Sequence, residues 1–276
     1  MTYAAAPNSV RSLEQRIRNL AGGDQQVQRR RITMSLVVIG QMLPEGAVKG
    51  GGALALRLGQ NSRFTRDLDA ARTGTLAAFR RAFEENLSAG WAGFTGRLVS
   101  KSAARPPSVP TAYVMQPFEV KLSYHGRPWC TVPFELGHNE LGDAEGAERI
   151  IADDVKTLFT GVGLRSPAPI PVMRTEHQIA QKLHAVSEHN SKRARDLVDI
   201  QLLERNEALD LSAVATTCIR LFSYRTQHSW PPQIHVGAGW ATLYEEASAG
   251  LAVAPSVDEA VDQVNDLVKR ICAAAL

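Results

Sequence analysis

The chain has 276 residues, of which 44% are hydrophobic and 21% charged, and its formal net charge is +3. These values are typical of a globular protein with one large or two modest domains and argue against a disordered chain. The longest apolar stretch, residues 35–40, is far too short to span a bilayer, and the first residues lack the plan of a signal peptide. Three scattered cysteines do not suggest a disulfide framework. We therefore expect a cytoplasmic protein without a membrane partner.

Apolar spacing and chain breakers predict an α/β protein. Helical periodicity predicts helices over residues 11–20 and 24–43, and Pro44 with Gly46 ends the second helix. A short apolar piece then leads through a glycine run into another helix, and residues 64–70 follow as an extended segment. The rest of the chain is predicted to form a helix at 75–87, strands at 94–100, 112–124 and 129–136, and helices at 176–189, 194–205, 211–223 and 257–274.

These elements divide the chain into three parts. Residues 1–44 are predicted to be an N-terminal helical segment, residues 45–166 an α/β core with a mixed sheet, and residues 167–276 a mainly helical C-terminal domain. The second boundary falls on a proline-rich piece, residues 167–171. Another proline-rich piece, residues 103–110, is predicted to be a long loop between two strands.

Two neighbouring motifs in the core point to phosphate chemistry. Gly50, Gly51 and Gly52 open a helix, and a glycine-rich helix start lets backbone N–H groups approach a phosphate closely. Further along, Asp67 and Asp69 lie two residues apart, so on a strand their carboxylates point to the same face. Two such groups repel unless a cation lies between them, and oxygen ligands of this kind suit Mg²⁺ or Mn²⁺. Each motif alone is common, but together they have the layout of the polymerase-β-like nucleotidyltransferases.

A third cluster lies on the predicted C-terminal helices. Lys182 stands among apolar neighbours, and a buried lysine needs a carboxylate or a phosphate as its partner. Asp196 and Asp199 are three residues apart and share a helix face. One interpretation is an ion pair between Lys182 and Asp196; the other is a lysine that reaches a phosphate. The basic runs at residues 29–31 and 192–195 are likewise either solvated helix faces or contacts for a polyanion.

These motifs together resemble the AbiEii/AbiGii-type nucleotidyltransferase toxins of toxin–antitoxin systems, which include the mycobacterial MenT toxins. The resemblance rests on the string KGGGALAL from Lys49 with RFTRDLD at 63–69, on FEVKLSYHGRPWCTVPFELG at 118–137, and on QIAQKLHAV followed by RARDLVDIQLL. It implies a polymerase-β-like core, Mg²⁺ or Mn²⁺ as cofactor, an NTP as co-substrate and a cognate antitoxin protein as partner. Some relatives add nucleotides to the 3′ end of tRNA and so block translation, which makes tRNA the expected acceptor.

The resemblance also implies roles for single residues. Asp67 and Asp69 would hold the metal. Lys182 would neutralise the triphosphate, and Asp196 would orient the side chain of Lys182. Arg63 or Arg66 would join the glycine run around the β- and γ-phosphates. The nucleotide-binding residues implied in this way are Lys49, Gly50, Gly51, Gly52, Arg63, Thr65 and Arg66.

Two residues are candidates for the third carboxylate of the site, and Glu135 is the expected one. Glu135 stands where many relatives have an aspartate, and it would be a metal ligand or the general base for the attacking hydroxyl. Glu119, one predicted strand earlier, is the alternative. Thr65 lies two residues before Asp67, so its phosphorylation would repel the NTP and compete for the metal.

Other chemistry finds little support in the sequence. His177, His184 and His189 do not have the i, i+4 spacing of a helical metal pair, and the chain contains no G-x-S-x-G motif of a serine hydrolase. No RNA-recognition motif is visible, so tRNA rests on the resemblance. Two alternatives stay open: the same transfer to a protein or small molecule, and an inactive chain that binds NTP, since Glu135 departs from the family pattern.

Overall fold

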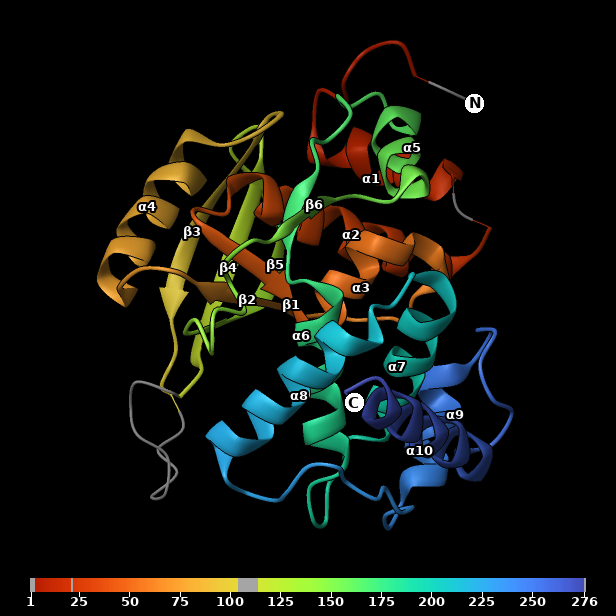
Figure 1. Ribbon diagram of the computed structural model, residues 1–276. Coiled ribbons are helices and arrows are strands. Elements are labelled where there is room, and N and C mark those ends of the chain that lie inside the picture. The colour runs from red at the N-terminus through yellow and green to blue at the C-terminus, as the bar shows by residue number, and fades with distance from the viewer. Residues whose placement is uncertain (1–2, 21, 104–113, 276) are drawn as a thin grey trace. The chain divides into compact units, whose positions relative to one another are not determined.

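The protein is described by a computed structural model that covers residues 3–20, 22–103 and 114–275. Its chain forms two compact units, Met1–Gln60 with Phe64–Met173, and Asn61–Arg63 with Arg174–Leu276 (Figure 1). The predicted helical segment at residues 1–44 shares the first unit with the core. The second unit begins at Arg174 because the residues before it still pair with the sheet.

A seven-stranded mixed sheet forms the centre of the first unit, in the order β3-β4-β5-β2-β1-β7-β6. Its strands are β1 (Gly46–Lys49), β2 (Leu68–Arg72), β3 (Phe94–Ser100), β4 (Gln116–Tyr124), β5 (Arg127–Gly137), β6 (Glu148–Ile150) and β7 (Ile170–Val172). Two neighbouring pairs, β2 with β5 and β1 with β7, are parallel, and the other pairs are antiparallel. The predicted mixed sheet is thus present.

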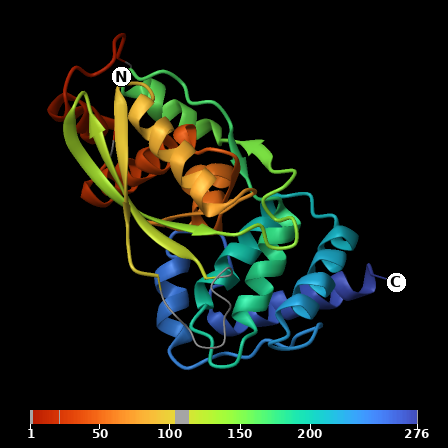
Figure 2. The same cartoon turned by 90° about the vertical axis from the view of Figure 1, so that its left-hand side faces the viewer.

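Five helices of the described chain belong to the first unit: α1 (Val10–Leu20), α2 (Asp24–Met42), α3 (Gly50–Leu58), α4 (Leu76–Ala89) and α5 (Asp153–Gly161). Helices α1, α2 and α4 pack on one face of the strands β3 and β5, and Figure 2 shows α4 beside these strands. The rings of Phe83 in α4 and Phe134 in β5 lie 5.2 Å apart. Strand β4 accordingly buries every second side chain, from Phe118 to Tyr124, and leaves the intervening ones partly exposed.

The second unit is helical in its described part, with α6 (Thr175–Val186), α7 (Ala194–Asn206), α8 (Leu211–Arg225), α9 (Trp240–Ser248) and α10 (Val257–Ala273). Helix α6 packs on α7 and α8, and α7 also packs on α9 and α10. Side chains of Asp210 and Ser256 cap the first N–H groups of α8 and α10, which explains where these helices begin. None of the helices in the described ranges is long and apolar enough to cross a membrane.

The predicted helices and strands are present, with shifted ends and one substantive correction. Residues 64–70 were expected to be extended throughout, but β2 begins only at Leu68, which pairs with Phe134 of β5, and its pairing with β1 starts one residue later, at Asp69 opposite Lys49. The structure adds β6, α5, β7 and α9, which the sequence pattern did not predict. Most of the predicted loop at 103–110, and the start of the strand predicted at 112–124, lie outside the described residues.

Candidate active site

At the end of strand β1 the backbone leaves space for a carboxylate. Gly50 starts α3 with a φ of +62°, a conformation that side-chain-bearing residues rarely adopt. A Cβ atom at this position would lie 2.3 Å from Oδ2 of Asp69, so the carboxylate occupies the space that the glycine leaves empty. Asp69 is thereby held beside the first turn of a helix, where backbone N–H groups lack helical partners. Only glycine meets both requirements at residue 50.

Three charged residues form a row across the middle of the sheet. Strand pairing sets Lys49 of β1 opposite Asp69 of β2, and Asp69 opposite Glu135 of β5. Registered residues on neighbouring strands share a face of the sheet. The ammonium of Lys49 extends over β5, because a Cβ atom on Gly137 would lie 2.9 Å from its Nζ. Glu135 is exposed, and the other two are partly exposed, so the row is open to a ligand.

Asp67 lies just before this row rather than within the strand. It is exposed, it precedes the first residue of β2, and its Oδ1 accepts a hydrogen bond of 2.6 Å from the hydroxyl of Thr65. Phe64, which the sequence motifs did not mark, is exposed next to this segment, and the guanidinium of Arg66 lies 5.4 Å from the centre of its ring. The carboxylates at 67 and 69 therefore flank the buried Leu68.

The two candidates for the third carboxylate occupy different strands. Glu135 lies on β5, directly beside Asp69. Glu119 lies on β4, with β5 between it and β2, and its carboxylate pairs with the ammonium of Lys101 at 3.0 Å. The hydrogen bond from Lys101, together with its charge and that of Lys121, holds the pKa of Glu119 below its usual value. This geometry favours Glu135 as the partner of Asp69.

The second unit contains a buried ionic cluster around Lys182. Its ammonium donates to Oδ1 of Asp196 at 3.0 Å and to Oδ2 of Asp199 at 2.6 Å. Arg63 donates to both oxygens of Asp199, at 2.8 and 3.0 Å, and Arg193 donates to Asp196 at 2.8 Å. The two aspartates emerge from one face of α7, as their spacing predicted. The ion pair between Lys182 and Asp196, one of the two interpretations of the sequence, is thus present.

Protonation in this cluster is set by the balance of burial and charge. Burial alone would lower the pKa of Lys182, but the carboxylates of Asp196 and Asp199 outweigh it and leave this pKa raised. Burial would likewise raise the pKa of Asp196, and the charges of Lys182 and Arg193 reverse this effect and leave it lowered. Both shifts favour the charged forms of Lys182 and Asp196.

The two basic runs differ in their surroundings. Arg29 donates to the carbonyl oxygen of Gln60 at 3.0 Å, and Arg31 donates to the carbonyl oxygen of Trp129 at 2.6 Å. These arginines thus hold parts of the first unit together, which supports the structural interpretation of the run at 29–31. In the second unit the run at 192–195 is exposed apart from Ala194, so it is a basic surface at the start of α7.

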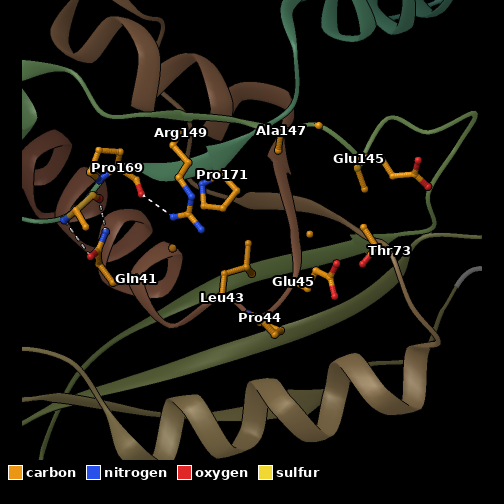
Figure 3. Close-up of a pocket in the computed structure, with 15 residues that line it drawn as sticks. Gln41, Leu43, Pro44, Glu45, Thr73, Glu145, Ala147, Arg149, Pro169 and Pro171 are labelled. Carbon is orange, nitrogen blue, oxygen red and sulfur yellow. Dashed lines mark hydrogen bonds between the residues drawn. The ribbon is translucent and has the colours of Figure 1, made fainter.

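A large pocket of the first unit lies away from the charged row. It has a volume of about 680 Å³ and is bordered by Gln41, Glu45, Thr73 and Arg149, among others (Figure 3). Its wall includes Gly46, the first residue of β1, whereas Lys49 is the last. The pocket and the row are therefore at opposite ends of this strand, about 10 Å apart. Its lining carries charges of both signs and contains none of the predicted site residues.

Comparisons with known proteins bear on the family and the fold of the chain. A model of the family described as nucleotidyl transferase AbiEii toxin, type IV TA system, matches residues 40–264. No curated protein matches the chain. The structure is similar to that of MenT4, a nucleotidyltransferase toxin from Mycobacterium tuberculosis H37Rv, with a TM-score of 0.51 and 16% identity over 97% of this chain and 99% of that one. The structure of JHP933 from Helicobacter pylori matches with a TM-score of 0.47 and 16% identity, over 92% of this chain and 95% of that one.

The family match covers most of the chain, including the glycine run, the charged row and the buried ionic cluster. The likeness to MenT4 shows that the fold is also shared, which confirms the predicted fold class. The chain is therefore a nucleotidyltransferase and belongs to the AbiEii family of nucleotidyltransferase toxins of type IV toxin–antitoxin systems.

Proposed function

We propose that this enzyme transfers a nucleotide from an NTP to the hydroxyl at the 3′ end of a tRNA, and that it thereby blocks translation and growth. The observation that carries the proposal is the row of Lys49, Asp69 and Glu135, with Asp69 seated against the glycine start of α3. The row combines carboxylates, a cation and a helix N-terminus, which are the groups that a metal-bound triphosphate requires.

The fit of a divalent metal depends on the number of protein ligands it needs. Among the described residues, no three side chains of His, Cys, Asp or Glu form a ready-made metal cluster. Mg²⁺, however, is usually held by one or two carboxylates together with substrate phosphates and water. Asp67 and Asp69 therefore fit Mg²⁺ or Mn²⁺ that binds with the NTP. When bound, the metal would neutralise charge on the triphosphate.

The chain's own groups would orient the reactants and receive the proton. The acceptor oxygen forms a bond to the α-phosphorus while the bond from this phosphorus to the bridging oxygen breaks, and pyrophosphate leaves. Glu135 would take the proton from the acceptor hydroxyl, or would serve as a further metal ligand. Gly50–Gly52 and Lys49 would face the phosphates. Arg66 is the better candidate than Arg63 for the β- and γ-phosphates, because Arg63 donates to Asp199.

Thr65 offers a test of this arrangement, since its hydroxyl donates to Asp67. We expect Thr65→Glu to lower nucleotide transfer by roughly 10²-fold, because a carboxylate here repels both Asp67 and the NTP and competes for the metal. Thr65→Ser retains the donor and should retain activity. Initial rates of the two variants, measured side by side, would check this. Equal rates for Thr65→Glu and Thr65→Ser would show that the segment does not face the triphosphate. A phosphate on Thr65 should inactivate the enzyme in the same way.

The proposed function itself is tested by incubating the purified protein with total tRNA, Mg²⁺ and each α-³²P-labelled NTP in turn. We expect label in the tRNA band with a restricted set of NTPs, and none with the Asp69→Ala variant. A second series of reactions offers a protein lysate as the acceptor instead of tRNA, and a third series offers an aminoglycoside.

The outcomes show separately which molecule accepts the nucleotide and whether the protein transfers a nucleotide at all. Label in protein or drug but not in tRNA would contradict the RNA acceptor and retain the transferase. Binding of Mg²⁺–NTP without release of pyrophosphate, in every series, would mean that the site is inactive. In both cases the family membership and the fold are unaffected.

A further inference from the structure

Strands β3, β4 and β5 have a second face, opposite the helices. On β4 the side chains of Glu119, Lys121 and Ser123 alternate with the buried ones and stay partly exposed. On β5 the exposed residues between the buried positions are Thr131, Pro133 and Glu135. We call this surface the open sheet face. Because Glu135 belongs to it, this face also carries the charged row of the candidate active site.

Strand register arranges the polar side chains of the open sheet face in rows. Arg97 of β3 lies opposite Lys121 of β4, which lies opposite Thr131 of β5. The next row toward the sheet's end contains Thr95 and Ser123, which are paired in the same way. Together with Pro128, the residues of these two rows line a hollow of about 370 Å³, which we call the sheet hollow.

The chemistry of the sheet hollow suits a phosphate group. Two cations, Arg97 and Lys121, face it together with three hydroxyl side chains, and none of the described residues that line it is acidic. Arginine binds phosphate through paired donors, and lysine and hydroxyl groups add further donors to its oxygens. Glu119, on this face but outside the lining, pairs with Lys101 at 3.0 Å and with Lys121 at 3.8 Å, so Arg97 is the cation of the hollow for which no such ion pair is seen among the described residues.

The sheet hollow is aligned with the candidate active site. Thr131 and Glu135 lie four residues apart on β5, which places them on one face about 13 Å apart. An extended polynucleotide strand whose terminal hydroxyl reached Glu135 and Asp69 would therefore pass over the sheet hollow with one of its preceding phosphates.

We infer that the sheet hollow binds a backbone phosphate of the single-stranded end of the RNA acceptor, a short distance before the hydroxyl that attacks. This inference rests on the proposed function, because it takes RNA as the acceptor. It assigns to Arg97 and Lys121 the role of positioning the acceptor strand, which neither the charged row nor the glycine run supplies. It also predicts that the acceptor lies along β5, and that recognition here is of phosphate and not of base sequence.

The inference is tested with the double variant Arg97→Ala/Lys121→Ala. A matched control, Arg80→Ala/Arg81→Ala, removes the same charge from α4, on the helix-covered side of the sheet. Binding of a short fluorescein-labelled single-stranded RNA is measured by anisotropy without NTP or metal, between about 50 and 200 mM salt. KM for tRNA, KM for NTP and kcat are then measured for the same proteins.

We expect the Arg97→Ala/Lys121→Ala protein, called the hollow variant, to bind the RNA about 10-fold more weakly than wild type. Its KM for tRNA should be higher by a similar factor, while its KM for NTP and its kcat stay near wild type. The slope of log affinity against log salt should become shallower by about 0.7, which corresponds to one lost phosphate contact on a single strand. The control should behave as wild type.

Unchanged RNA binding and unchanged KM for tRNA in the hollow variant would overturn the inference and leave the proposed function standing. An equal loss in the control would also overturn it, because it would reflect net charge alone. Transfer by the wild type to protein only, with no RNA binding, would instead remove the proposed function and this inference with it.

Discussion

Asp69→Asn should lower nucleotide transfer by about 10³-fold while the protein stays folded. Asparagine has nearly the shape of aspartate, so it still fits the space that Gly50 leaves at the start of α3. What it loses is the negative charge that would hold the metal beside Lys49 and Glu135. Because the substitution changes charge and not volume, a loss of activity reports on chemistry and not on packing.

The matched control for this prediction is Glu119→Gln. It is the same change from carboxylate to amide on the open sheet face, but on β4, at a side chain that pairs with Lys101. We expect it to keep most of the activity in the radiolabelling assay, with circular dichroism to verify the fold of both variants. Near-wild-type turnover from folded Asp69→Asn would remove Asp69 from the active site. A comparable loss in Glu119→Gln would instead point to Glu119 as the third carboxylate.

The fold could be predicted where local signals are strong. Apolar spacing and capping residues such as Asp210 and Ser256 mark the helices of the second unit. The missed elements have weak or conflicting local signals. Strand β7 contains Pro171 between its two buried residues, and proline lacks the N–H group that a strand interior uses. It exists because Ile170 and Val172 bury their side chains beside β1 and β6, which is a long-range effect.

The site shows the same division between local and long-range information. The glycine run and the two aspartates lie close together in the sequence, and their spacing suggested phosphate and metal chemistry. The pairing of Asp69 with Glu135 joins strands far apart in the chain, so it depends on strand register, which adds support to the expected choice of Glu135 over Glu119. Asp67 was expected within the strand, but it lies just before Leu68, the first residue of β2.

The buried ionic cluster around Lys182 is a case in which the residue types alone do not decide the role of a side chain. A lysine among apolar residues indicates a buried partner, but it does not say whether the partner is a carboxylate or a phosphate. In the structure two carboxylates bind Lys182, and Arg63 binds one of them. Arg63 also directly precedes the segment that leads to Asp67 in the chain. The cluster thus has a structural role on its own, and its proposed role with the triphosphate has to be tested separately from it.

Lys182→Met should lower the free energy of unfolding by about 3–5 kcal/mol, because it leaves two buried carboxylates without the ammonium that neutralises them. The lysine is 5% exposed and the side chain of Asp199 is fully buried, so water cannot replace the lost charge. Urea denaturation of the whole chain measures the effect. Lys192→Met, at an exposed lysine, is the control and should change the free energy of unfolding little. An unchanged midpoint for Lys182→Met would mean that the ion pairs do not form in solution.

The same variant separates the two roles of Lys182 when transfer is assayed at a temperature at which it is fully folded. If the lysine only stabilises the second unit, the folded variant should turn over like wild type, with unchanged KM for NTP. If it also neutralises the triphosphate, the folded variant should show a raised KM for NTP and a lower kcat. Asp196→Asn provides the comparison, because it weakens the cluster while the ammonium remains. A defect in transfer that appears in Lys182→Met and not in Asp196→Asn would therefore belong to the charge of Lys182 itself, since both substitutions disturb the same buried network.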